Sequence, residues 1–281
     1  MLFKSINAIW RRYCSYFIII FIITMKNKIL FNKRFSRALA TLAFLLITAT
    51  SFAQNLKVAA AANLQGVIKV LQADFLQKTG IGIDPIIGSS GQLVAQIHNG
   101  APFDIFLSAD MTFPQTLFKD GLTLKAPVVY ASGSLIICST QNLGFDNWER
   151  MLLTEKIKKI AIANPAIAPY GKAADEVLQA KGILSEIKSK VVQGESIAQV
   201  NTYITTGVAD VGFTTQALIK DAAGKTVLYY KVIDPKLYAP IQQGIVILKH
   251  ADGNAKAQKF YQYILSADAK HIFKEYGYYV E

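Results

Sequence analysis

The stretch Gly82–Ser108, GIDPIIGSSGQLVAQIHNGAPFDIFLS, predicts a strand, a turn, a helix and a second strand in that order. A strand-like apolar run at 82–87 is followed by Gly-Ser-Ser-Gly, and apolar residues then recur at helical spacing up to Gly100. The run from Phe103 to Ser108 is again of strand type. Strands that alternate with helices in this way form βαβ units with a parallel sheet.

The same alternation continues along the chain. Leu56–Ala62 predicts a first strand, and the helix after it has a stop signal at Gly80. A second set of alternating strands and helices covers 158–215, and the strand-rich segments 128–140 and 239–250 are long enough to cross between two lobes. We therefore predict an α/β protein of two lobes, each a mainly parallel sheet flanked by helices, joined by two crossing strands. Small molecules commonly bind at such an interface.

The first 53 residues have the composition of an export leader. They contain eight of the 30 Lys and Arg residues and no Asp or Glu. From Met25 onward a basic stretch precedes the apolar run ALATLAFLLITAT, and small residues suited to cleavage stand before Gln54. We predict a signal peptide at 25–53, with 1–24 as an over-long start, and export to the periplasm. A membrane anchor is the alternative, although the apolar run is shorter than the roughly 20 residues of a spanning helix.

The chain after the leader is nearly neutral. It keeps 22 Lys and Arg against 19 Asp and Glu, a net charge of +3 compared with +11 for the whole sequence. A nucleic-acid-binding protein needs a concentrated basic face, so this composition argues against one. Cys138 is the one cysteine after the leader and lies in the apolar run LIICS, where we expect a core residue and no internal disulfide.

An enzymatic role for the serines of the Gly-Ser-Ser-Gly turn lacks the residues it would need. The stretch 88–92 does not supply the Gly-x-Ser-x-Gly pattern of a nucleophile elbow. A base is also required, and His98 lies about two helical turns from Ser90. We expect His250 on a surface loop and His271 on the last helix. No paired-cysteine, HExxH or clustered-histidine pattern indicates a metal site.

A binding loop explains the same turn better. The first N–H groups of a helix have no intrahelical partner and lie at the positive end of the helix dipole, so they suit an anion. A single Ser-Gly turn is most often only a helix cap. Repetition favours binding, because four predicted turns between a strand and a helix expose hydroxyl, amide or bare backbone groups: Ala59–Asn63, Gly88–Gly91, Asn164–Gly171 and Gly194–Ser196. Such turns lie at the carboxyl ends of parallel strands, where ligands bind.

These residues resemble the periplasmic molybdate-binding proteins of ABC transporters, in the type II solute-binding superfamily. The similarity covers nearly all of 56–281, and its most specific part is IIGSSGQLVAQIHNGAPFDIFLSAD, supported by VAAAANLQGVI, IAIANPAIAPYGKAADEVL and AKHIFKEYGY. The resemblance implies the type II periplasmic-binding-protein fold and no enzymatic activity or cofactor. It also implies capture of molybdate, with tungstate as the second candidate, and delivery by a monomer to an inner-membrane ABC permease with its ATPase. Molybdenum would be held only as the oxyanion.

The resemblance also implies which residues bind the ion. Asn63, expected at the N-cap of its helix, matches a family position that is commonly Ser or Asn. Ser90 matches the second residue of the family's serine pair. Tyr170 lies in the turn where a backbone N–H, and in some members a tyrosine, contacts the ion. Ile197 matches a backbone amide at a helix start.

A fifth contact departs from the family pattern. Several members supply a tyrosine hydroxyl from the segment that corresponds to 212–215, but Phe213 has none. Thr215 is the substitute that the sequence offers. The predicted lobes are 54–134 plus 240–281 and 135–239. The rival functions are the same fold binding sulfate or phosphate, and a secreted serine hydrolase.

Overall fold

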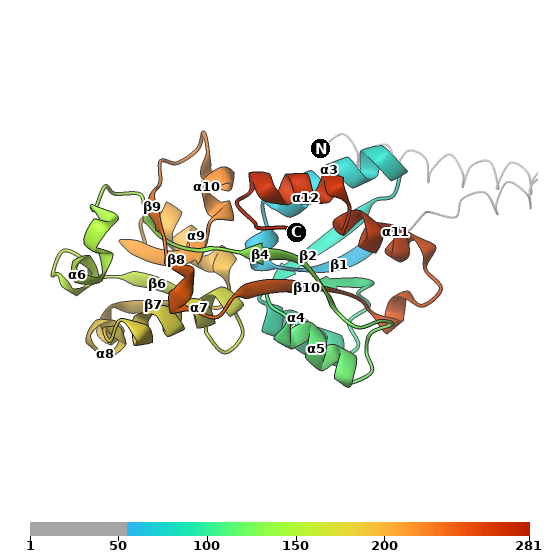
Figure 1. Ribbon diagram of the computed structural model, residues 1–281, viewed down its shortest axis with the longest axis horizontal. Helices are drawn as coiled ribbons and strands as arrows, with labels where there is room; N and C mark the ends of the chain where they lie inside the picture. Colours follow the sequence, from blue (N-terminus) through green and yellow to red (C-terminus); the bar gives the residue numbers. More distant parts are fainter. Residues whose placement is uncertain (1–54) are drawn as a thin grey trace, which may run out of the picture. The chain divides into compact units, whose positions relative to one another are not determined.

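The computed structural model describes residues 55–281. The predicted signal peptide at 25–53 and the residues before it lie outside this range. The described chain contains two five-stranded sheets with helices packed against them, and the chain crosses from one sheet to the other at 133–135 and again at 232–241 (Figure 1). The predicted two-lobe α/β fold is confirmed.

The first sheet combines parallel and antiparallel strands. Strand β1 pairs in parallel with β2 and β3, whereas β10 pairs antiparallel with both β3 and β4. Its strands, in spatial order, are β2 (Ile83–Gly88), β1 (Leu56–Ala61), β3 (Ile105–Leu107), β10 (Ile241–Ile247) and β4 (Val128–Gly133).

The second sheet repeats this plan. Strand β6 pairs in parallel with β7 and β8, and β5 pairs antiparallel with β8 and β9. Its strands, in spatial order, are β7 (Val191–Gly194), β6 (Ile160–Ala163), β8 (Val211–Thr215), β5 (Leu135–Ser139) and β9 (Tyr229–Val232).

Helices cover both faces of each sheet. We call the first sheet with its five helices lobe I; these helices are α3 (Val67–Thr79), α4 (Ser90–His98), α5 (Thr112–Lys119), α11 (Ala255–Ile264) and α12 (Ala267–Glu275). The second sheet and its helices form lobe II; these helices are α6 (Trp148–Leu153), α7 (Pro169–Ala180), α8 (Leu184–Ile187), α9 (Ile197–Thr205) and α10 (Ala217–Ala222). Short 3-10 turns complete the chain: η1 (Ala62–Leu64), η2 (Phe145–Asn147), η3 (Lys188–Lys190), η4 (Pro235–Leu237) and η5 (Lys249–Ala251).

The spacing of the apolar residues in helix α3 determines which face of the helix packs against the sheet. Val67, Ile68, Leu71 and Phe75 follow one another at intervals of one to four residues, and all four are buried against the first sheet. Gly80 then adopts a left-handed conformation (φ 69°), which ends the helix at the predicted position.

The two lobes are connected without a flexible linker. Strand β4 ends at Gly133 and β5 begins at Leu135, so the chain passes from the first sheet to the second within two residues. Strand β10 carries the chain back into lobe I, where its end Ile247 pairs with β3. All strands of each sheet fall inside the predicted lobes 54–134 plus 240–281 and 135–239; the lobe bounds themselves stay a prediction.

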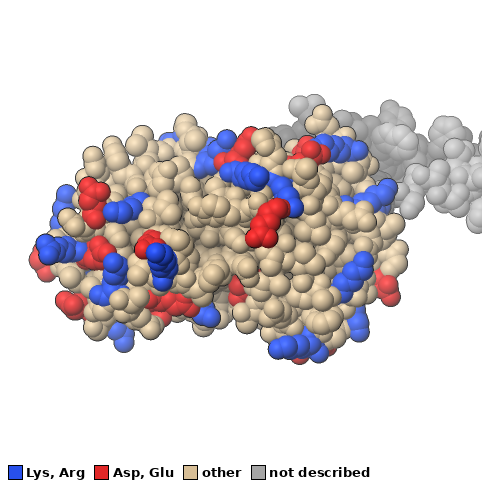
Figure 2. Space-filling view, in the orientation of Figure 1, with Lys and Arg blue, Asp and Glu red and all other residues tan. Residues whose placement is uncertain are grey.

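The burial of the cysteine and the distribution of charge in the described residues agree with the expectations from the sequence. Cys138 is fully buried in β5, and burial raises the pKa of its thiol to about 12. Lys, Arg, Asp and Glu side chains are interspersed over the face shown in Figure 2, with no continuous basic stripe there. Among the helices within 55–281, none combines the length and apolarity required to cross a bilayer.

Candidate functional site

A small pocket lies where the four predicted turns meet. Its volume is about 10 Å³, far below the roughly 300–1,000 Å³ of a pocket for an organic molecule of drug size. None of its lining side chains is charged. The lining comes from both lobes: Ala61, Ala62, Asn63, Ser89, Ser90, Ala109, Ala168, Pro169, Tyr170 and Ile197. Four of the five predicted ligand-binding residues are therefore brought together.

Asn63 belongs to the part of the pocket lining that comes directly after β1. It is buried in the 3-10 turn η1, and α3 begins only after Gly66, so the expectation that Asn63 caps this helix is wrong. The turn at Ala62–Leu64 separates the strand from the helix and directs the side chain inward. Its Nδ2 donates to Gln243 Oε1 (3.0 Å) and to the hydroxyl of Tyr278 (3.1 Å).

The two serines at the start of α4 have different tasks. Ser89 is the N-cap: its Oγ accepts from Gln92 N–H, and the Gln92 side chain accepts from Ser89 N–H, which forms a capping box. Ser90 is the first helical residue and is 1% exposed. Its Oγ accepts from Ala109 N–H (3.0 Å), so its hydroxyl hydrogen remains available for a ligand.

Lobe II supplies two further helix starts. Helix α7 begins with Pro169, which has no N–H, so the N–H of Tyr170 is the first one that this helix offers. Helix α9 begins at Ile197 behind the N-cap Ser196, whose Oγ accepts from Gln199 N–H. The backbone amides of Tyr170 and Ile197 belong to the first turns, where N–H groups have no intrahelical partner.

Thr215 does not line this pocket. Its hydroxyl donates to the hydroxyl of Tyr170 (3.2 Å) and accepts from Ala217 N–H (3.3 Å), which places it one layer behind the pocket wall. Phe213 packs edge-on against Trp148 in the core of lobe II.

A layer of buried polar side chains behind the pocket was not predicted. Gln243, Tyr130 and Tyr278 are at most 4% exposed, and each bonds to another member of the layer or to Asn63. Burial raises the pKa of both tyrosines well above the usual value, so their hydroxyls stay protonated. The signal in the sequence was a glutamine inside the otherwise apolar strand IQQGIVI.

Two contacts join the lobes beside the pocket. Gly91 N–H donates to the carbonyl of Ile167 (2.9 Å), and Gln92 Nε2 donates to Glu195 Oε2 (3.2 Å). Both connect the first turn of α4 to lobe II, so the lobes are closed on each other at the site.

The three histidines lie away from the small pocket. His98 Nε2 lies 2.8 Å from Asp120 at the far end of α4, and His271 Nε2 lies 3.4 Å from Glu275 on α12. His250 lies in the exposed turn η5. Within the described chain no histidine lines the pocket with Ser90, and the pocket therefore suits binding through neutral donors better than nucleophilic chemistry.

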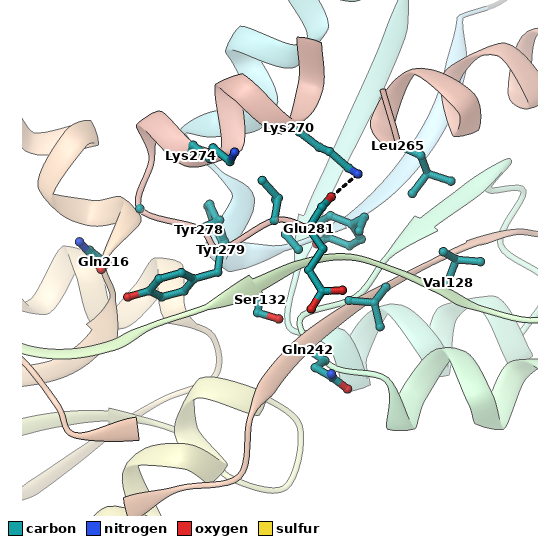
Figure 3. Close-up of a pocket in the computed structure, with 15 residues that line it drawn as sticks. Val128, Ser132, Gln216, Gln242, Leu265, Lys270, Lys274, Tyr278, Tyr279 and Glu281 are labelled. Atoms are coloured by element: carbon teal, nitrogen blue, oxygen red, sulfur yellow. Dashed lines mark hydrogen bonds between the residues drawn. The ribbon is translucent and has the colours of Figure 1, made fainter. Parts of the chain in front are cut away.

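A much larger pocket lies on the other side of the polar layer, where Tyr130 and Tyr278 form part of its lining. It measures about 940 Å³ and lies beside β4 and the C-terminal segment, with Lys270 and Lys274 on one side (Figure 3). In Figure 3 the Lys270 ammonium group donates to the backbone oxygen of Glu281. None of the five predicted ligand-binding residues lines this pocket.

Comparison with known proteins gives consistent matches. The family model for bacterial extracellular solute-binding proteins matches residues 56–279. The molybdate-binding protein ModA of Azotobacter vinelandii is 35% identical over 244 residues, which cover 86% of this chain and 97% of that protein. ModA of Rhodobacter capsulatus is also 35% identical, over 79% of this chain and 87% of that protein. The solved structure of the A. vinelandii periplasmic molybdate-binding protein superposes with a TM-score of 0.77 and covers 81% of this chain and all of that one.

Proposed function

The chain belongs to the bacterial extracellular solute-binding proteins, and on that basis we propose that it captures molybdate outside the cytoplasm for an ABC transporter. The resemblance found in the sequence is confirmed by relatives that are named as binding proteins, not enzymes. The observation that carries the proposal is the small, uncharged pocket at which the starts of η1, α4, α7 and α9 meet.

The chemistry of this pocket suits a fully deprotonated oxyanion. Molybdate and tungstate are dianions with no proton to donate near neutral pH. A site made of donors leaves a protonated oxyanion with an unmatched O–H, which costs about 1–3 kcal/mol for a buried group. Hydrogen bonds to a charged acceptor are roughly twice as strong as neutral ones, so several can replace hydration without a lysine or an arginine.

Each lobe would contribute donors. From lobe I we assign the hydroxyl of Ser90 and the side chain of Asn63. From lobe II we assign the backbone N–H groups of Tyr170 and Ile197. Thr215 would act indirectly, through the hydroxyl of Tyr170.

The remaining partners follow from the transporter context. We infer a monomer that is exported by the leader at 25–53 and delivers the ion from the periplasm to a permease with its ATPase. Closure about the strands β4 and β10 would bring the two donor sets together, a hinge motion.

Isothermal titration of residues 54–281 with molybdate tests the proposal. We expect one ion per chain, displaced by tungstate but not by phosphate, which keeps a proton near neutral pH. Sulfate carries no proton, so we expect the dimensions of the closed pocket, not its donors, to exclude it at the same concentration. Equal displacement by sulfate or phosphate would assign the pocket to another oxyanion, and the absence of binding heat with an unchanged melting temperature would refute an oxyanion site.

A further inference from the structure

Gln243 connects the two halves of the pocket from behind. It lies on the crossing strand β10, at the irregularity between Gln243 and Gly244, and its side chain is fully buried. Its Oε1 accepts from Asn63 Nδ2 (3.0 Å), and its Nε2 donates to the hydroxyl of Tyr170 (3.2 Å). One amide group thus contacts a proposed ligand-binding residue of each lobe. A buried amide is costly unless its hydrogen bonds are satisfied, so these contacts constrain the orientation of all three side chains.

This arrangement of hydrogen bonds leaves one buried atom without a partner and one hydroxyl hydrogen shared between two acceptors. Among the described residues, Asn63 Oδ1 is the buried side-chain atom that has no hydrogen-bond partner. The hydroxyl of Tyr130 lies 2.8 Å from Gln243 Oε1 and 3.1 Å from the carbonyl of Ser108, but one hydroxyl hydrogen cannot serve both acceptors fully. An acceptor left unpaired in the wall of the pocket would also repel an anion.

Turning both amides by 180° removes these conflicts. The oxygen and nitrogen of an amide are nearly identical in shape, and the hydrogen-bond network decides which is which. After the turn, Gln243 Nε2 donates to Asn63 Oδ1 and to Tyr130, whose own hydrogen is then free for Ser108. Gln243 Oε1 accepts from Tyr170. The hydroxyl of Tyr278 donates to the backbone carbonyl of Asn63 (2.8 Å) in either orientation. Before the turn it also accepts from Asn63 Nδ2, and after the turn it lies beside Asn63 Oδ1, for which Gln243 Nε2 is the donor.

The turned arrangement leaves one unpaired group, and it is a donor. Asn63 Nδ2 takes the position that had no partner, so the wall of the pocket needs an acceptor there. We propose that Gln243 is a positioning residue that holds the Asn63 amide with its nitrogen toward a bound oxyanion. This role rests on the proposed function, because the oxyanion supplies the missing acceptor.

Measuring the effect of Gln243→Met with asparagine and with serine at position 63 distinguishes a positioning role from a general contribution to folding. In Gln243→Met the side chain keeps its length but loses its hydrogen bonds, so Asn63 loses its orientation. In the Asn63→Ser background the hydroxyl can rotate by itself and does not need Gln243. Gln242→Met, at the exposed neighbouring position on the same strand, is the matched control.

Titration with molybdate of the protein expressed from the full chain gives the readout. We expect Gln243→Met to weaken binding about tenfold or more when residue 63 is asparagine, and less than about threefold in the Asn63→Ser background. The control should bind as the unaltered protein does. Equal losses in both backgrounds would overturn the positioning role. Absence of binding by the unaltered protein would instead contradict the proposed function.

A second measurement needs no altered glutamine, in case Gln243→Met does not fold. The side-chain amide signals of Asn63 are identified in nitrogen-15 NMR spectra by their loss in Asn63→Ser. On addition of molybdate these signals should shift, and their hydrogens should exchange more slowly with water. Unchanged Asn63 signals in a protein that binds molybdate would overturn the inference.

Discussion

The backbone N–H of Gly91 donates to the carbonyl oxygen of Ile167 over 2.9 Å, which ties the first turn of α4 in lobe I to the turn that precedes α7 in lobe II. The contact leaves no space for a side chain. A Cβ at position 91 would lie 2.9 Å from the Cβ of Ile167 and 3.0 Å from its Cα. The closed arrangement of the pocket therefore requires glycine at this position.

We predict that Gly91→Ala weakens molybdate binding about tenfold or more. Overpacking costs about 1–3 kcal/mol, and here the cost falls on the closed state alone. Titration measures the affinity, and small-angle X-ray scattering with saturating ligand should report incomplete closure. Gln96→Ala, at an exposed position of the same helix, is the control and should leave both unchanged. Full affinity in Gly91→Ala would show that this contact is not part of the bound state.

Substitutions of the adjacent residues Ser89 and Ser90 should affect different properties, the stability of the fold and the affinity for molybdate. Ser90→Ala removes a proposed ligand donor, so we predict weaker molybdate binding by about 1–3 kcal/mol. Ser89→Ala removes the helix cap and should lower the free energy of unfolding by about 1 kcal/mol, with little change in affinity. Titration and thermal unfolding of both variants measure the two effects. If Ser89→Ala loses more affinity than Ser90→Ala, the assignment of the donor is wrong.

Thr215→Val tests the indirect role of this threonine. The substitution removes the hydroxyl that bonds to Tyr170 and Ala217, so we expect a loss of about 1 kcal/mol in stability and less than about threefold in affinity. Unfolding in urea gives the first value and titration the second. A loss of affinity as large as that of Ser90→Ala would mean that Thr215 contacts the ion directly.

Binding should be independent of pH over a wide range. The one lining side chain that can titrate is that of Tyr170, and burial raises its pKa, so the hydroxyl keeps its proton. Between about pH 6 and pH 9, where an ordinary histidine would lose its proton but this tyrosine would not, the affinity for molybdate should stay within about twofold. Titrations at several pH values check this. A steep fall near the pKa of histidine would indicate a charged group in the site.

The sequence was sufficient to predict the local elements and most of the pocket. Turns such as Gly88–Gly91 combine a strand end, a capping residue and a helix start within a few positions, so they can be recognised locally. The pocket lining contains four of the five expected residues, although their contacts with the ion remain predictions. The short elements α5, α8, α10 and β9 were not predicted. Helix α5 has a proline in its third position, and β9 is a short edge strand with largely exposed side chains.

The remaining features depend on contacts between distant parts of the chain. Gln243 meets Asn63 across 180 positions, and Tyr278 meets it across 215. Neither pair has a local pattern that would connect its members. The expectation that Asn63 is a helix N-cap is wrong for a related reason. An asparagine between a strand and an apolar helical run resembles an N-cap, and only the intervening turn η1 shows that it is turned into the interior.

Anomalous X-ray scattering at the molybdenum edge, from crystals grown with molybdate, locates the bound ion. We predict one strong peak per chain in the small pocket, within hydrogen-bonding distance of the Ser90 hydroxyl and of the Tyr170 and Ile197 backbone amides. A peak instead in the large pocket beside Lys270 and Lys274, or no ordered peak in a protein that binds molybdate, would contradict this prediction.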